Sequence, residues 1–298
     1  MAITGPKLLN GDNLLYRLFQ KLLASDDQMV RSAIAGEMIR SMTIWLPLDF
    51  YQNCPVILPW VVRNPKCRPH KLQGIQYPDR WGAPDELGYQ MDDNSLIKGI
   101  PKSLPIDGPK DSPLVGKKMG NDFVASHIWR EIDGVDVLAS RHPELNSFAP
   151  NLVWLPRQIA KLSDREGQMI QDLLKLASWA IYREVKVNQN YTEVVGAIWK
   201  YLEKDVKKVT EKYRFDPESA HYFQPKDEKF VLRRIEIARK ALVFISSCEN
   251  GTPNPSKSTT SRYANGLPNV KKRVLSNLKK QVSKFVAVEL NLTDGRHC

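Results

Sequence analysis

At residues 123–130 the chain reads Phe-Val-Ala-Ser-His-Ile-Trp-Arg, and at residues 151–156 it reads Asn-Leu-Val-Trp-Leu-Pro. Both stretches contain short apolar runs with β-branched and aromatic residues, so we predict a strand in each. Pro156 suits the first turn of a helix, which we expect to continue through Leu162. The predicted order is strand, loop, strand, helix, with His127 at the end of the first strand and an asparagine at the start of the second.

This segment resembles the HNH nuclease family, which implies a small ββα-metal module. By that resemblance His127 is the general base and Asn151 is the residue that fixes the loop and the base. The family commonly places a metal ligand directly before the base and another at the start of the helix. Here those two positions hold Ser126 and Ala160, with Lys161 beside the latter.

Hydrolysis of a phosphodiester needs a deprotonated water molecule and positive charge near the phosphate. A histidine takes that proton near neutral pH, and a divalent cation stabilises the developing negative charge. We expect Mg²⁺, or else Mn²⁺, with Asp122, Asp164 or Asn146 as candidate substitute ligands. Charge stabilisation by Lys161 is the alternative to a metal. A further alternative is an ordinary histidine near a core strand, or a module that only binds nucleic acid.

The basic residues are concentrated near the C-terminus. The whole chain has a net charge of +11, and residues 201–298 contain 20 Lys+Arg and 11 Asp+Glu, a net of +9. A polyanion, most simply double-stranded DNA, is the partner that such charge predicts, and a solubilising surface is the alternative. The candidate DNA-binding residues are Arg233, Arg234, Lys257, Arg262, Lys271, Lys272 and Arg273.

Outside the central segment, the pattern favours a mainly helical α+β fold. Helices are expected at about 12–24, 26–42, 191–211 and 227–247, with one opened by Ser163 as N-cap and a last one from about Pro268. The proline-rich stretch 46–113 favours strands and ordered loops. Its acidic segment, residues 92–95, can approach the predicted nuclease module, cap the helix or strand that follows it, or be solvated. We divide the chain into 1–113 (helical and proline-rich), 114–185 (nuclease module and following helix) and 186–298 (basic and helical).

Several classes of protein are disfavoured. Apolar runs are too short to cross a membrane, which needs about 20 residues, and we expect a cytoplasmic protein. Cys54, Cys67 and His70 lack the paired spacing of a structural zinc site, so none is expected. Glycine loops of the kind that bind nucleotides are missing from the sequence. We therefore predict a restriction-type or other defence endonuclease, with a homodimer expected if both strands are cut.

Overall fold

The computed structural model describes residues 19–63, 84–131, 138–163, 168–210, 214–224, 229–253 and 267–294. Most of the predicted helix at 12–24 lies outside these ranges. So do Asp164, Lys257, Arg262, Cys67 and His70, whose predicted roles are not addressed by the structure.

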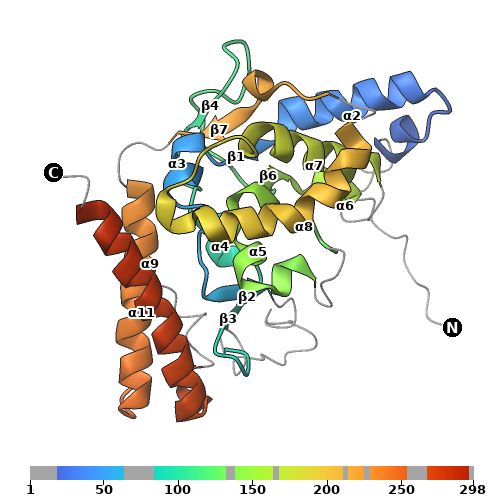
Figure 1. The fold of residues 1–298 in the computed structure, drawn as a ribbon. Coiled ribbons are helices and arrows are strands. Elements are labelled where there is room, and N and C mark those ends of the chain that lie inside the picture. Colours follow the sequence, from blue (N-terminus) through green and yellow to red (C-terminus); the bar gives the residue numbers. More distant parts are fainter. Residues whose placement is uncertain are drawn as a thin grey trace, which may run out of the picture.

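A five-stranded mixed sheet lies at the centre of the described part of the chain, with strand order β4-β7-β1-β6-β5 (Figure 1). The pair β1–β7 is parallel, and the other neighbouring pairs are antiparallel. Each of the three predicted segments contributes at least one strand to this sheet. The strands are β1 (Ile44–Trp45), β4 (Ile106–Asp107), β5 (Phe123–His127), β6 (Leu152–Pro156) and β7 (His221–Phe223).

The two longest of these strands are the ones predicted from residues 123–130 and 151–156. They pair antiparallel, from Phe123 opposite Pro156 to His127 opposite Leu152. Leu152, Val153, Trp154 and Leu155 are fully buried, which explains why β6 reads as an uninterrupted apolar run. After β6 the chain enters helix α6 (Arg157–Ser163), which contacts both strands. The prediction of two strands followed by a helix is therefore confirmed.

Helices α2, α7 and α8 pack together beside the sheet (Figure 1). Tyr182 of α7 is fully buried, and its hydroxyl donates to the Leu46 carbonyl oxygen at 2.6 Å. Trp199 of α8 donates from Nε1 to the Tyr51 hydroxyl at 2.9 Å, so aromatic side chains join these helices to the core. The helices are α2 (Gln28–Met42), α3 (Leu48–Asn53), α7 (Met169–Tyr182) and α8 (Thr192–Thr210).

The starts of two helices differ from the prediction. Ser163 does not cap the following helix but is the last residue of α6, where its hydroxyl donates to the Ala160 carbonyl oxygen at 2.9 Å. Helix α7 begins at Met169, after Gln168. The helix predicted to start near Pro268 begins at Lys272, after a short 3₁₀ turn.

A small parallel pair, β2 (Val61–Arg63) and β3 (Gln90–Asp92), lies beside the end of β5. Its register places Arg63 opposite Asp92, and the chain then turns through Asn94 into the short helix α4 (Ser95–Gly99). Asn94 has φ of +76°, a left-handed conformation that asparagine tolerates better than most residues. The helix α5 (Pro143–Asn146) and the 3₁₀ turns Ala139–Arg141 and Ala149–Asn151 connect β5 to β6.

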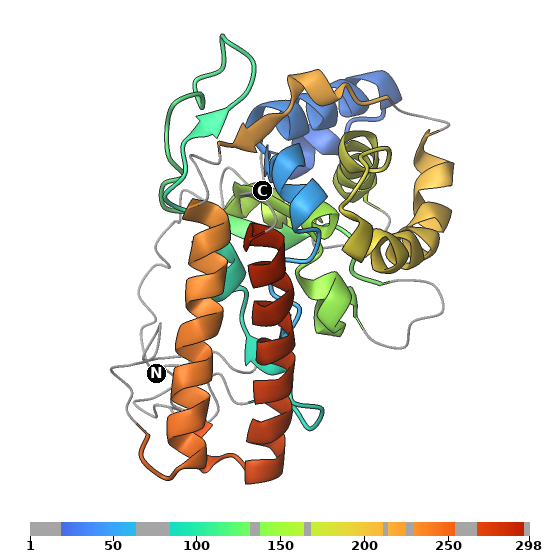
Figure 2. The same cartoon turned by 60° about the vertical axis from the view of Figure 1, so that its left-hand side comes forward.

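The chain ends in two long helices, α9 (Lys229–Glu249) and α11 (Lys272–Asp294), that pack along each other (Figure 2). Lys279 pairs with Glu249 at 2.7 Å near one end. Near the other end Arg234 lies over the Phe285 ring, so the helices run antiparallel. Among the described helices, none is long and apolar enough to cross a membrane. Together with the mixed sheet, these helices confirm the α+β class.

Candidate functional site

Asn151 holds the backbone directly after β5. Its side chain is fully buried, and its Oδ1 accepts hydrogen bonds from the backbone amides of Ile128 at 3.1 Å and Trp129 at 2.8 Å. Its Nδ2 donates to the Leu145 carbonyl oxygen at 2.9 Å. One amide side chain therefore fixes the residues that follow His127 and ties them to the loop that leads to β6.

His127 has a defined tautomer. Its Nε2 lies 2.8 Å from the backbone carbonyl oxygen of Asn146, and because a carbonyl can only accept, Nε2 carries the proton. Nδ1 is then the unprotonated nitrogen, and Nδ2 of Asn94 lies 3.4 Å from it. The side chain is 5% exposed. Burial, followed by the nearby charge of Arg63, lowers the pKa of His127 to about 4, so the imidazole is neutral at physiological pH.

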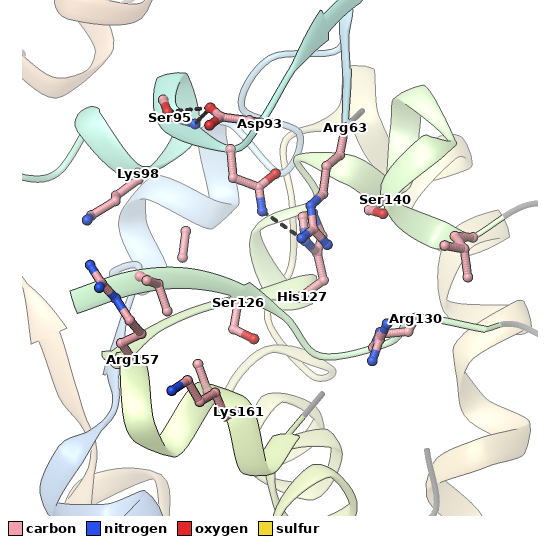
Figure 3. Close-up of a pocket in the computed structure, with 15 residues that line it drawn as sticks. Arg63, Asp93, Ser95, Lys98, Ser126, His127, Arg130, Ser140, Arg157 and Lys161 are labelled. Atoms are coloured by element: carbon pink, nitrogen blue, oxygen red, sulfur yellow. Dashed lines mark hydrogen bonds between the residues drawn. The ribbon is translucent and has the colours of Figure 1, made fainter. Parts of the chain in front are cut away.

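His127 lines a pocket of about 540 Å³ (Figure 3). The pocket is bounded by β5, by α4 with the loop before it, by α6 and by the segment after β5. Among the described residues that line it, five carry a positive charge and one carries a carboxylate. The cationic residues are Arg63, Lys98, Arg130, Arg157 and Lys161, and the acidic residue is Asp93.

The cations lie on both sides of β5. In Figure 3, Lys98 lies above the strand that carries Ser126 and Lys161 lies below it, whereas Arg63 lies near His127. Arg157 and Lys161 are four residues apart on α6 and so share one face of that helix. Burial, followed by the positive charges of Arg157 and Lys102, lowers the pKa of Lys98.

The predicted substitute ligand Asp122 lies beside Arg157. Its carboxylate is 3.2 Å from the guanidinium, and both side chains are more than half exposed. Asp122 is not among the described residues that line the pocket. The structure thus places this carboxylate against a cation at the pocket's edge and does not bring it to His127.

The donor set around His127 does not fit a divalent cation within the described ranges. Asp93 accepts hydrogen bonds from the backbone amide and the hydroxyl of Ser95, and Ser126 Oγ lies 3.4 Å from the Ser163 hydroxyl. No group of three or more His, Cys, Asp or Glu residues that could hold a metal occurs in the described part of the chain. Of the other predicted ligands, Asp164 lies outside those ranges, and Asn146 donates from Nδ2 to the Val61 carbonyl oxygen at 2.8 Å. Cys54 is a buried free thiol.

Residues 92–95 both cap the helix that follows them and approach His127, which are two of the three possibilities considered for them. Asp92 Oδ2 accepts from the Leu96 backbone amide at 3.1 Å, and Asp93 Oδ1 accepts from the Ser95 amide, so both carboxylates stabilise the start of α4. Asn94 at the same time approaches His127. Its Oδ1 is buried and has no hydrogen-bond partner within the described residues.

Most of the pocket's cations were not predicted from the sequence. Arg130 ends the quoted stretch, and Arg157 precedes Lys161 by one helical turn, so both could have been found by extending the predicted strand and helix. Arg63 and Lys98 lie far from His127 in sequence. The pairing of β2 with β3 brings them to the pocket, and no local pattern signals that pairing.

The predicted DNA-binding residues on the last two helices have different environments. Arg233 is exposed and donates to the Ile100 carbonyl oxygen at 3.3 Å and the Ser103 hydroxyl at 3.2 Å. Arg234 corrects the prediction, because its side chain is fully buried. It donates to the Ile57 carbonyl oxygen at 3.0 Å and lies over two aromatic rings, so phosphates cannot reach it. Residues 271–273, the basic triplet Lys271, Lys272 and Arg273, are exposed.

The pocket and the neutral histidine in its wall are the features from which a function has to be inferred. A histidine with one ring nitrogen anchored and the other unprotonated can accept a proton. A cavity with an excess of positive side chains attracts anions. Comparison with family models, with curated proteins and with solved structures finds no match for this chain.

Proposed function

We propose that this protein is an endonuclease that hydrolyses phosphodiester bonds in DNA, with His127 as general base. The observation that carries the proposal is the position of its neutral imidazole in the wall of a pocket lined by five cationic residues among those described. Few substrates need both a proton acceptor and a strongly positive cavity. A phosphodiester is the common biological group that needs both.

The local chain path supports the same proposal. A histidine that ends the first of two antiparallel strands, an asparagine that precedes the second and a helix that follows directly form the arrangement that the HNH resemblance implies. Asn151 would act as a positioning residue, since it contacts the backbone after His127 and does not line the pocket. Its three hydrogen bonds would keep the imidazole at a fixed place relative to the phosphate.

The proposed reaction uses the two nitrogens of His127 differently. Nε2–H stays bonded to the Asn146 carbonyl oxygen and holds the ring in place. Nδ1 takes a proton from the attacking water molecule. The negative charge that builds up on the phosphate raises the affinity of the ring for that proton and so offsets the lowered pKa. Lys161 and its neighbours would stabilise the same negative charge.

DNA is the proposed substrate because basic surface continues beyond the pocket. Arg233 is bonded to the segment directly after α4, which contributes Lys98 to the pocket. A second exposed basic group, residues 271–273 at the start of α11, lies at the other end of the helix pair from Arg233. A duplex held by these helices could enter the pocket with one strand. A restriction or defence role, with two copies cutting the two strands, is the biological setting that we propose.

The second candidate is a nucleic-acid-binding protein without catalysis. The pKa of about 4 favours it, because so weak a base removes a proton from water slowly. The amino acids at Ser126 and Ala160, which are not metal ligands, favour it as well. This candidate predicts retention of DNA at the same basic surface with no change in the covalent backbone.

A plasmid assay separates the two candidates. Supercoiled DNA is incubated with the wild-type protein, with Mg²⁺, Mn²⁺ or EDTA, and the products are separated on a gel after the protein is removed. We expect nicked or linear DNA from the wild type and a rate lower by about 10² to 10⁴ for His127→Ala. Retarded mobility before protein removal, with intact plasmid afterwards, would establish the binder and refute the nuclease.

A further inference from the structure

The side chains that line the pocket carry a net positive charge, which disfavours a bound cation and favours a bound anion. Its described lining brings five cationic side chains to one cavity, and Asp93, the carboxylate among them, already accepts two hydrogen bonds from Ser95. A divalent cation placed there would be repelled by each neighbouring arginine and lysine. A phosphate would be attracted by all of them.

The helix α6 places positive charge where the HNH pattern has a metal ligand. At that position stands Ala160, which lines the pocket and is too small to fill it, and Lys161 follows directly. Arg157 lies one turn earlier on the same face, and Lys98 of α4 lines the pocket from the other side of β5 (Figure 3). Three cations from two helices thus line the same pocket as Ala160, the position where the resemblance implies a metal ligand.

We infer that this pocket is a metal-independent phosphate site, in which Lys98, Arg157 and Lys161 supply the positive charge that a divalent cation supplies in the HNH family. The inference rests on the proposed nuclease function and specifies its cofactor requirement. The lowered pKa of Lys98 is consistent with it, because an anion between these side chains would relieve their mutual repulsion.

The hydrolytic step needs no further reactant. The oxygen of a water molecule attacks phosphorus and forms the new P–O bond, while His127 Nδ1 takes one of its protons. The bond from phosphorus to one sugar oxygen breaks, and that oxygen leaves with a proton from solvent. His127 then returns its proton to solvent. The three cations neutralise the non-bridging oxygens throughout, as hydrogen-bond donors do in an oxyanion hole.

The first test is cleavage of plasmid by protein that has been dialysed against EDTA and assayed in EDTA. We expect the wild type to retain its rate within about threefold of that in Mg²⁺. Lys161→Met and Arg157→Met should each lower the rate in EDTA by about 10² to 10³, the effect of removing one preorganised donor. Lys110→Met removes the same charge from an exposed residue outside the described pocket lining and should change the rate little.

The second test measures binding without catalysis. Inorganic phosphate, compared with chloride at equal ionic strength, should raise the melting temperature of the wild type by about 2–4 °C when phosphate is well above its dissociation constant. The double variant Arg157→Met with Lys161→Met should lose this rise, and Lys110→Met should keep it. In chloride the double variant should melt close to the wild type, because the Arg157–Asp122 ion pair that it loses is exposed and such pairs contribute about 0–1 kcal/mol.

The outcomes distinguish the inference from the proposed function. Cleavage that occurs in Mg²⁺ and stops in EDTA would overturn the inference and leave the nuclease standing. A phosphate-induced rise that survives in the double variant would overturn it as well. If plasmid stays intact in every buffer, both the nuclease and this account of its cofactor requirement are refuted.

Discussion

The side chain of Asn151 gives the sharpest stability prediction. In Asn151→Ala the backbone amide of Trp129 loses the acceptor that it has among the described residues, at 2.8 Å. The Leu145 carbonyl oxygen loses its 2.9 Å donor and keeps a long contact of 3.4 Å from the Phe148 amide. The Ile128 amide is affected less, because the Asn151 backbone oxygen, at 3.0 Å, also accepts from it.

The expected loss follows from these partners. A buried polar group left without a hydrogen bond costs about 1–3 kcal/mol. One amide fully orphaned and one carbonyl partly orphaned therefore predict a loss of about 2–4 kcal/mol in the free energy of unfolding. Urea denaturation followed by tryptophan fluorescence measures this loss, provided that the slope of the unfolding free energy against urea concentration is the same for the two proteins.

A matched control is Asn53→Ala. Asn53 lies at the end of α3 and donates a single hydrogen bond, at 2.9 Å, to the Asp49 carbonyl oxygen. Its substitution should cost at most about 1 kcal/mol, since solvent can replace that donor. If Asn151→Ala cost no more than Asn53→Ala, the account of Asn151 as the residue that holds the end of β5 would be refuted.

Three further predictions concern pH, a buried arginine and salt. Burial, and then the charge of Asp93, raises the pKa of Asp92 to about 7, so the folded state loses stability as pH rises from about 4 through 7. Asp92→Asn should therefore have a free energy of unfolding up to about 4 kcal/mol higher than the wild type at pH 8, and this difference should disappear near pH 4. If urea denaturation gives the same difference at both pH values, this prediction is contradicted. Arg234→Ala should lower the free energy of unfolding by about 3 kcal/mol or more, while Arg233→Ala should lower it by less than about 1 kcal/mol. Equal losses for the two variants in urea denaturation would place Arg234 outside the core. Neutralising residues 271–273 should flatten the slope of log affinity for duplex DNA against log salt by about two to three units in anisotropy titrations, whereas an unchanged slope would show that this triplet does not contact phosphates.

The sequence identified the parts of the fold that rest on local patterns. The apolar runs at β5 and β6 are strands because their side chains are buried on the sheet, and Pro156 marks the change to α6. The helices α8 and α9 follow from apolar spacing in the same way, whereas in α2 the apolar residues Met29 and Val30 are exposed. The role of Ser163 was missed because the serine and the glutamate of a capping box were present, yet the chain uses the serine to end the preceding helix.

The basic surface shows what charge alone does not reveal. Arg233 and Arg234 are neighbours in sequence but are about 100° apart around a helix, so one faces outward and the other inward. Sequence does not show that Phe50 and Phe285 would enclose the second guanidinium, since both come from distant segments. The composition of the pocket could not be predicted for the same reason. Arg63 and Lys98 come to the pocket that His127 lines only through the pairing of β2 with β3.

The most direct test of the central claim is the single-turnover nicking rate of His127→Gln at saturating DNA. Glutamine is chosen because its amide can still donate to the Asn146 carbonyl oxygen, as Nε2 of the imidazole does, while it lacks a basic nitrogen. We predict a rate lower than that of the wild type by about 10² to 10⁴, with an affinity for DNA within about twofold of the wild type. An unchanged rate, with affinity intact, would show that His127 is not the base.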